Sequence, residues 1–258
     1  MRRRTVVLAI VASVAVGIAM FGSSVFFGQY FQLARGYSPT ESGLLTLPMI
    51  IGLLVASTLF GRLVTRTGRW KSILVVGTAL IVVGLGLLAT IDHASPIPVV
   101  GVYMAILGVG VGMTMQNLVL AVQNDIDFSD LGAGTSTVTF FRSLGGAAGV
   151  SVLGAILAVR VSDLTRDGLA GIPGAVEATR SGGSTSLDIW SLPEPIRDVV
   201  ARAYADGTAM VFLLSGVVAL VALLAVLFIR EARLRTTIGS PAQAPGSADT
   251  ATESQTAA

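Results

Sequence analysis

Six apolar runs, each long enough to cross a bilayer, limit the folds that this chain can adopt. They occupy residues 6–31, 43–64, 73–91, 97–122, 131–159 and 208–229. A helix needs about 20 mainly apolar residues to span the hydrocarbon core, because each residue adds about 1.5 Å of rise. No Asp or Glu lies within any of the six runs. The sequence therefore predicts an all-α membrane protein with six transmembrane helices, surrounded by the lipid bilayer.

Composition supports a membrane protein and argues against several other classes. Charged residues make up 12% of the chain, whereas soluble domains carry about 25%. The chain has no cysteine and one histidine, His93, so neither a thiol metal site nor a histidine cluster can form. The net charge of +2 gives no sign of a nucleic-acid partner. Because no nucleophile–base pair or phosphate loop is present either, we expect no enzyme activity, no metal and no cofactor.

Basic residues predict the orientation of the spans, because cytoplasmic loops are enriched in Lys and Arg. The run that follows Arg2, Arg3 and Arg4 continues to Phe27, longer than a signal-peptide core, so we expect an uncleaved first span. Both termini are then cytoplasmic. Only Lys71 among the 17 basic residues is lysine, a bias typical of GC-rich bacterial genomes, so the inner membrane of a bacterium is expected. The further basic residues that favour this orientation are Arg62, Arg66, Arg69, Lys71, Arg230, Arg233 and Arg235.

Two segments lie outside the predicted spans. Residues 160–207 form an expected outer loop, whose second part, LPEPIRDVVARAYADG, has the period of a short amphipathic helix. Its apolar side carries Ile196, Val199, Val200 and Ala203, and a simple cap over the last two spans is favoured over a gate. Residues 1–235 would thus form the bundle. Residues 236–258 are rich in Ala, Ser, Thr, Gly and Pro and are expected to be a disordered cytoplasmic tail.

The fifth run carries one full charge, Arg142, well inside its apolar stretch. An arginine at the centre of a span costs roughly 2.5–3.5 kcal/mol on insertion scales, so Arg142 is expected to face protein or water rather than lipid. Gly145 and Gly149 follow at a spacing that lets a neighbouring helix come close. This run therefore combines a packing face with a polar point near mid-depth, as in a bundle that surrounds a cavity.

Other polar side chains are the remaining candidates for a substrate cavity, and a plain structural alternative stands beside them. Gln116 and Asn117 could line the cavity or could bond to a neighbouring helix's carbonyl oxygen. The fourth and fifth runs are expected to be antiparallel neighbours, with Arg142 level with residues 110–113. The close glycines of the fourth run would leave room for its side chain. The candidate cavity residues are Gln29, Gln32, Gln116, Asn117, Thr139 and Arg142, and the candidate packing glycines are Gly108, Gly112, Gly145 and Gly149.

The connection between the second and third runs, Gly61-Arg-Leu-Val-Thr-Arg-Thr-Gly-Arg-Trp-Lys71, has the character of a tight basic turn. It resembles the signature loop of the major facilitator superfamily, G-x-x-x-D-R-x-G-R-[RK]. Gly61, Arg66, Gly68 and Arg69 occupy the matching places. Thr65 replaces the acid of the pattern and Trp70 interrupts the basic pair, which puts the charge relay of that loop in doubt.

Two longer stretches, GQYFQLARGYSPTESGLLTLP and LGAGTSTVTFFRSLGGAAGVSVLGAIL, make residues 27–159 similar to the last six helices of the fourteen-helix drug:proton antiporter family. The resemblance implies one half of a transporter, built from two inverted three-helix repeats. It implies that the first, second, fourth and fifth spans line a central cavity for a small-molecule substrate. The acids that carry protons in that family belong to the other half.

Two hypotheses of function follow. The first is the C-terminal half of a proton-coupled multidrug or small-molecule exporter, which pairs with an N-terminal transporter half or a second copy. The second is a non-transporting membrane scaffold or accessory subunit, or a truncated fragment, in which Arg142 only docks a partner helix.

Overall fold

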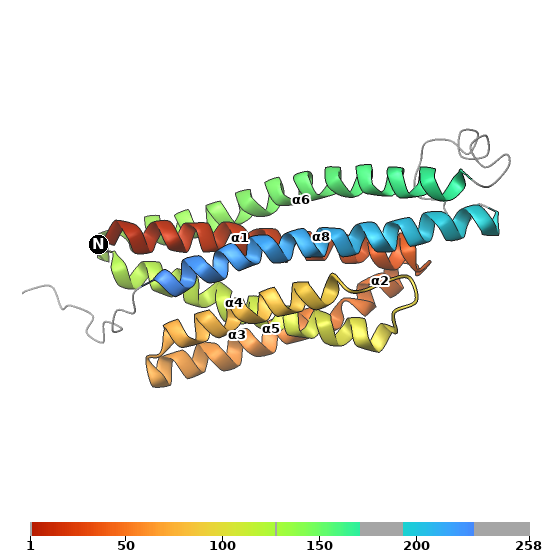
Figure 1. Cartoon of the computed structure of the whole chain (residues 1–258). Coiled ribbons are helices and arrows are strands. Elements are labelled where there is room, and N and C mark those ends of the chain that lie inside the picture. Colours follow the sequence, from red (N-terminus) through yellow and green to blue (C-terminus); the bar gives the residue numbers. More distant parts are fainter. Residues whose placement is uncertain (1, 127, 171–192, 230–258) are drawn as a thin grey trace, which may run out of the picture.

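The computed structural model describes residues 2–126, 128–170 and 193–229 (Figure 1). Within these ranges every regular element is helical. Six segments are long and apolar enough to cross a membrane, which confirms the predicted fold class. The elements in chain order are α1 (Arg2–Gln29), the π-helix η1 (Tyr30–Ala34), α2 (Pro39–Leu45), α3 (Leu47–Thr67), α4 (Trp70–Leu88), α5 (Ile97–Asp125), the 3₁₀ turn η2 (Phe128–Asp130), α6 (Leu131–Leu169) and α8 (Glu194–Phe228).

The long helices form two groups that run side by side (Figure 1). One group contains α1, α6 and α8, and the other contains α3, α4 and α5. The two triplets that follow each other in sequence are α1–α3–α4 and α5–α6–α8. The first helix of each triplet packs with two helices of the other triplet: α1 packs on α6 and α8, while α5 packs on α3 and α4. Figure 1 shows the start of α1 and the end of α8 at the same end of the bundle, as an even number of crossings requires.

The second span begins earlier than its apolar run suggests. Ser38 caps α2 by accepting from the backbone N–H of Glu41, and the Glu41 carboxylate accepts from the Ser38 backbone in return. Pro39 occupies the first turn, where its missing N–H costs nothing. The helix is interrupted at Thr46, just before Pro48, and continues as α3. Apolarity alone could not reveal this start because Pro39–Ser42 is polar and its capping residues, rather than its hydropathy, make it helical.

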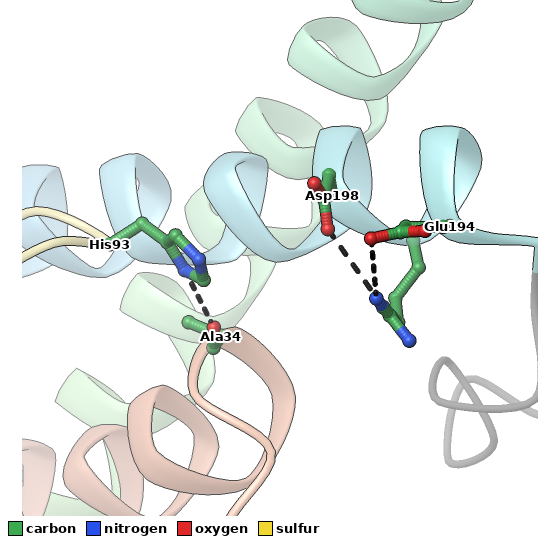
Figure 2. A network of polar contacts seen from close by, with 5 residues as sticks. Ala34, His93, Glu194 and Asp198 are labelled. Atoms are coloured by element: carbon green, nitrogen blue, oxygen red, sulfur yellow. Dashed lines mark hydrogen bonds and ion pairs between the residues drawn. The ribbon is translucent and has the colours of Figure 1, made fainter.

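The end of α1 is fastened to the turn between α4 and α5. The Tyr30 hydroxyl donates to the Asp92 carbonyl oxygen at 2.8 Å. The Arg35 guanidinium donates to the carbonyl oxygens of His93 and Ser95. Figure 2 shows the His93 ring pointing at Ala34, whose carbonyl oxygen lies 2.9 Å from Nδ1. Because the turn residues 92–95 link the two sequential triplets, these bonds, which we call the turn clasp, tie one triplet to the other.

Helices α6 and α8 continue beyond the predicted spans. Helix α6 has 39 residues and α8 has 35, about 58 and 52 Å at 1.5 Å per residue. The predicted short amphipathic helix is thus the start of α8 and not a separate element. Its expected apolar side does face inward: Ile196 and Val200 form a small cluster with Leu169 of α6. Figure 1 shows these ends reaching past the other helices, and residues 171–192 and the predicted tail lie outside the described residues.

The outward side of the α8 extension is charged. Arg197 lies 3.9 Å from a Glu194 carboxylate oxygen and 3.8 Å from one of Asp198, an arrangement visible in Figure 2. Such exposed pairs stabilise a helix by only about 0.3–0.5 kcal/mol. The apolarity of a run could not predict these extensions, because water satisfies charged helix surfaces outside the bilayer and the helix can continue there.

The alternating glycines of α5 face two different helices. A Cβ at Gly108 would lie 2.1 Å from the Met49 carbonyl oxygen of α3, and one at Gly112 would lie 2.4 Å from that of Leu53. Gly110 instead faces α4, where an added Cβ would meet the Ile81 backbone nitrogen at 2.7 Å. The expectation that these glycines leave room for Arg142 is therefore wrong, since α3 and α4 fill that space.

Candidate functional site

The crossing of α1 and α6 sets the position of the central arginine. A Cβ at Gly17 of α1 would lie 2.1 Å from the Arg142 carbonyl oxygen. A Cβ added at Gly145 would lie 2.8 Å from Val14, and one added at Gly149 would lie 2.6 Å from Ile18. The two backbones can approach this closely only because glycine occupies these contacts. The main partner of α6 is therefore α1. Helix α5 is also a neighbour of α6, as expected from the short α5–α6 connection.

Arg142 lies inside the bundle with only 7% of its surface exposed. Its Nη2 donates to the Met115 carbonyl oxygen of α5 at 3.3 Å. This carbonyl lies slightly further along α5 than the expected level of residues 110–113. Its Nε is buried and, among the described residues, has no hydrogen-bond partner. One weak bond to a neutral acceptor does not compensate a buried guanidinium, which has five N–H donors and a full charge.

Gln116 and Asn117 line a pocket of about 410 Å³ between α3 and α5. Gln116 is exposed, whereas Asn117 is buried and donates from Nδ2 to the Met113 carbonyl oxygen of its own helix at 2.6 Å. Asn117 therefore bonds within α5, rather than to a neighbouring helix. Polar or charged residues in the rest of the wall are Ser57, Thr58, Arg62, Thr65 and Gln123.

Gln29 and Gln32 line a second pocket, of about 350 Å³, between α1, α6 and α8. Gln32 belongs to the π-helix η1, a rare form that is frequent at functional sites. Gly28 and Gly154 contribute no side chain to the pocket wall, and Tyr204 of α8 adds a side chain with a hydroxyl group. The candidate cavity residues are thus divided between two pockets, with Arg142 in neither.

Thr139 lies on the exposed side of α6, where its hydroxyl donates to the Thr135 carbonyl oxygen at 3.0 Å. This side also exposes small polar residues, whereas the exposed side chains of α8 within the span are bulky and apolar. A lipid-facing surface has the character of the α8 side. The exposed side of α8 therefore suits lipid, and the polar face of α6 suits protein or water. Helix α6 also exposes bulky apolar side chains, namely Phe140, Leu144, Val152 and Val159. The residues of the polar α6 face are Ser136, Thr139, Ser143 and Ser151, and the α8 residues are Met210, Leu213, Val217, Leu220 and Leu224.

The loop that resembles the family signature forms a tight turn. Gly68 has φ of +69°, a conformation that suits glycine, and its N–H donates to the Val64 carbonyl oxygen. Arg66 and Arg69 are exposed, while Trp70 is buried and anchors the start of α4. A Cβ at Gly61 would meet nothing within 4 Å among the described residues, so no close packing is observed at this glycine.

Several pocket residues were not predicted from the sequence, among them Arg62, Gln123 and Tyr204. Gln123 joins α5 to α6, because its Nε2 donates to the Thr135 hydroxyl at 2.9 Å. Gln123 and Arg62 lie at span ends, where polar residues are ordinary, so neither carried a signal. Tyr204 was hidden in a segment interpreted as a surface cap.

Comparison with known proteins gives the family. Residues 1–150 match the family model of the major facilitator superfamily. The chain is 42% identical over 224 residues to an uncharacterised transporter of this superfamily from Mycobacterium tuberculosis, with 87% of this chain and 32% of that protein covered. It is 35% identical over 170 residues to a multidrug transporter of Bacillus subtilis, with 66% of this chain and 31% of that protein covered.

A more distant relative is a tetracycline resistance determinant of Streptomyces rimosus, 25% identical over 253 residues, with 89% of this chain and 73% of that protein covered. The chain spans about a third of the length of the Mycobacterium and Bacillus proteins. With six membrane-crossing helices that interlock as two triplets, and with this match over more than half its length, the chain is a multi-pass membrane protein of the major facilitator superfamily.

Proposed function

We propose that this chain acts as the C-terminal half of a proton-coupled exporter of small molecules. The family membership and the relatives named as a multidrug transporter and a tetracycline resistance determinant support export. The chain covers only about a third of the length of the Mycobacterium and Bacillus relatives, which supports a role as one half of a transporter. A second half would complete the central cavity along the small, polar side of α6.

The observation that carries this proposal is the incomplete environment of Arg142. The guanidinium is 7% exposed and bonds to one neutral carbonyl. Since none of the six apolar runs contains an acid, a carboxylate near mid-depth must come from outside this chain. An acid on the partner half would supply that charge and could release it on protonation.

Coupling to protons therefore requires the partner half. A proton-driven carrier needs a group in the membrane that loads and releases a proton, and Arg keeps its proton at any physiological pH. This chain alone binds substrate weakly or not at all and moves none against a gradient. The partner is an N-terminal transporter half, with a second copy of this chain as the other candidate.

Proteoliposomes test this proposal with tetracycline as the probe. We expect no uptake driven by a pH gradient with this chain alone, and uptake when the chain is reconstituted with the N-terminal half of a major facilitator exporter. Uptake by the chain alone would refute the need for a partner. Absence of uptake by the complete pair, for both tetracycline and ethidium, would refute drug export.

The same proposal includes an orientation. Both termini lie in the cytoplasm of a bacterium, with the charged extensions of α6 and α8 outside. The exposed basic residues Arg62, Arg66 and Arg69 at the α3–α4 turn support it, because basic residues favour the cytoplasmic side.

The alternative is a membrane scaffold in which Arg142 only docks a partner helix. One observation favours it, namely the bond from Arg142 to the Met115 carbonyl oxygen, which joins α6 to α5. In the reconstituted pair, Arg142→Ala would leave export intact if the scaffold hypothesis holds, and would abolish it if Arg142 serves the transport site.

A further inference from the structure

A groove of about 420 Å³ lies between α6 and α8, apart from the two pockets described above. Its floor and sides are apolar, with Ala155, Ile156 and Val159 from α6 and Met210 from α8. Arg160 and Asp163 of α6 stand at one end. The groove is therefore apolar along its length, with one positive and one negative side chain at one end, which we call its mouth.

The charged end of the groove lies at the membrane boundary. Gly207 of α8 packs against Leu157 and Val161, where an added Cβ would lie 2.7 and 3.1 Å from their side chains. Arg160 is therefore level with the start of the apolar part of α8, which follows the exposed Asp206. The apolar residues from Thr208 to Phe228 cover about 30 Å, the thickness of the hydrocarbon core. Headgroups would lie beside Arg160, and acyl chains beside Val159 and Met210.

The groove opens between apolar residues of α6 and the exposed apolar side of α8. Val159 is 63% exposed and Met210 is 39% exposed. The exposed residues of α8 that follow Met210 into the membrane, Leu213 and Val217, are apolar. The pocket with Gln29 and Gln32 lies on the opposite flank of α6, toward α1. This groove is thus open to the bilayer whichever end of the bundle is cytoplasmic.

The two charges at the mouth are not neutralised within the described part of the chain. Arg160 and Asp163 are both exposed, and no ion pair joins them to each other or to another described residue. Residues three apart on a helix have Cβ atoms about 5–6 Å apart on one face. This spacing fits an anion and a cation that are separated by two carbon atoms.

We propose that the groove binds a phospholipid with an ethanolamine headgroup. The Arg160 guanidinium holds the phosphate, and the Asp163 carboxylate accepts N–H bonds from the ammonium group. One acyl chain lies along Ala155, Val159 and Met210. A choline headgroup has no N–H to donate to Asp163, and the headgroup of phosphatidylglycerol offers no cation to this carboxylate. This inference does not depend on the proposed transport function.

Native mass spectrometry of the full chain in detergent tests the proposal with equimolar phosphatidylethanolamine, phosphatidylcholine and phosphatidylglycerol. We expect ethanolamine lipid to be retained about threefold over the other two, as one or two charge-assisted bonds at an exposed site allow. Retention should persist through mono- and dimethylation of the amine. It should fall at the third methyl group, which removes the last N–H.

Variants separate the two contacts. Arg160→Gln should weaken all three lipids, since all carry a phosphate. Asp163→Asn should lose the preference for ethanolamine and raise retention of phosphatidylglycerol. Met210→Trp should displace lipid by filling the groove while both charges remain. Arg166→Gln and Asp167→Asn are matched controls, because the same residue types lie further along α6, exposed and outside the groove.

The results are decisive in either direction. Equal retention of the three lipids by the wild-type chain would overturn the proposal, as would equal losses in the controls and in Arg160→Gln. A preference that survives the third methyl group would show that Asp163 does not read the amine and would also overturn it. Size-exclusion profiles and helical circular dichroism check that each variant is folded, which exposed substitutions of this kind should preserve.

Discussion

At the scale of single residues, Arg142 is a buried charge whose hydrogen-bonding groups are only partly paired. A buried guanidinium with one carbonyl acceptor costs stability in this chain, and a carboxylate beside it would offset part of that cost. Among the described residues, no carboxylate pairs with this guanidinium, which donates to the Met115 carbonyl oxygen.

Arg142→Met should leave the stability of this chain unchanged or raise it by about 2 kcal/mol, because it removes an uncompensated buried charge and keeps most of the side-chain volume. Thermal melting in detergent measures this. Arg142→Lys is the comparison, since it keeps the charge and loses the planar fork. A loss of several degrees in Arg142→Met alone would mean that the bond to Met115 matters more than the charge.

Gly145→Ala should destabilise the α1–α6 crossing by about 1–3 kcal/mol, because the new Cβ would lie 2.8 Å from the Val14 backbone. Gly154→Ala on the same helix is the matched control. A Cβ there meets nothing within 4 Å among the described residues, and alanine should stabilise α6 by up to about 1 kcal/mol. Equal effects of the two substitutions in a melting experiment would contradict this account of the crossing.

Some properties of single residues were predictable from the sequence and others were not. That Arg142 avoids lipid followed from the cost of its charge. Its neighbours did not follow, because helix pairing depends on glycine contacts such as Gly17 with Arg142, and single glycines in a glycine-rich span do not say which helix they meet. The separation of Gln29 from Gln116 into two pockets depends on the same pairing.

At the scale of elements, the turn clasp joins α1 to the α4–α5 turn. Within the turn, the Asp92 carboxylate accepts from the Ser95 hydroxyl at 2.7 Å and from the Ala94 N–H at 2.9 Å. These bonds, the Ser95 hydroxyl foremost, favour the charged form and lower the pKa of Asp92 below its ordinary value. A lowered pKa in the folded state adds stability above the unfolded pKa, and this stability is lost as the pH falls through the folded value.

Ser95→Ala should therefore lower the melting temperature at neutral pH and have a smaller effect once the pH falls below the lowered pKa of Asp92, because the carboxyl group is then protonated in the folded wild-type protein as well. Melting curves between about pH 3 and 7 check this. Thr90→Ala is a suitable control, because its hydroxyl bonds only to the preceding Leu87 carbonyl oxygen. A difference between wild type and Ser95→Ala that does not change with pH would show that Asp92 does not contribute through its charge.

Helix boundaries were predictable where the apolar run and the helix begin at the same residue, as at Ile97 for α5 and at Leu131 for α6. They were not predictable where a helix leaves the membrane and continues in water. The charged turns of α6 after Val159 and of α8 before Thr208 belong to this class, since hydropathy reports the solvent of a helix and not its length.

At the scale of the whole molecule, six crossings place the α3–α4 turn and the α4–α5 turn on opposite sides of the membrane. The chain contains no cysteine, so single cysteines report topology cleanly. In intact cells, Ala94→Cys should react with a membrane-impermeant maleimide, while Thr67→Cys should react only after permeabilisation. The reverse pattern would invert the proposed orientation, and reaction of both in intact cells would contradict the six-span topology.

The class of fold was the most predictable property, because six long apolar runs without an acid leave a helical bundle as the only membrane architecture that satisfies their backbones. The arrangement within the bundle was less predictable. It depends on which helices meet closely, and the short α5–α6 connection predicted one neighbour of α6 but not its main partner, α1.

The glycines of α5 have a mechanical consequence. Because Gly108 and Gly112 meet backbone carbonyls of α3 while Gly110 meets the backbone of α4, axial slip of α5 would press a side chain into a gap that admits only hydrogen. Helices α3, α4 and α5 are therefore held in one axial register. The other three helices, α1, α6 and α8, meet this block along a seam, and the guanidinium of Arg142 reaches across that seam from α6 to α5.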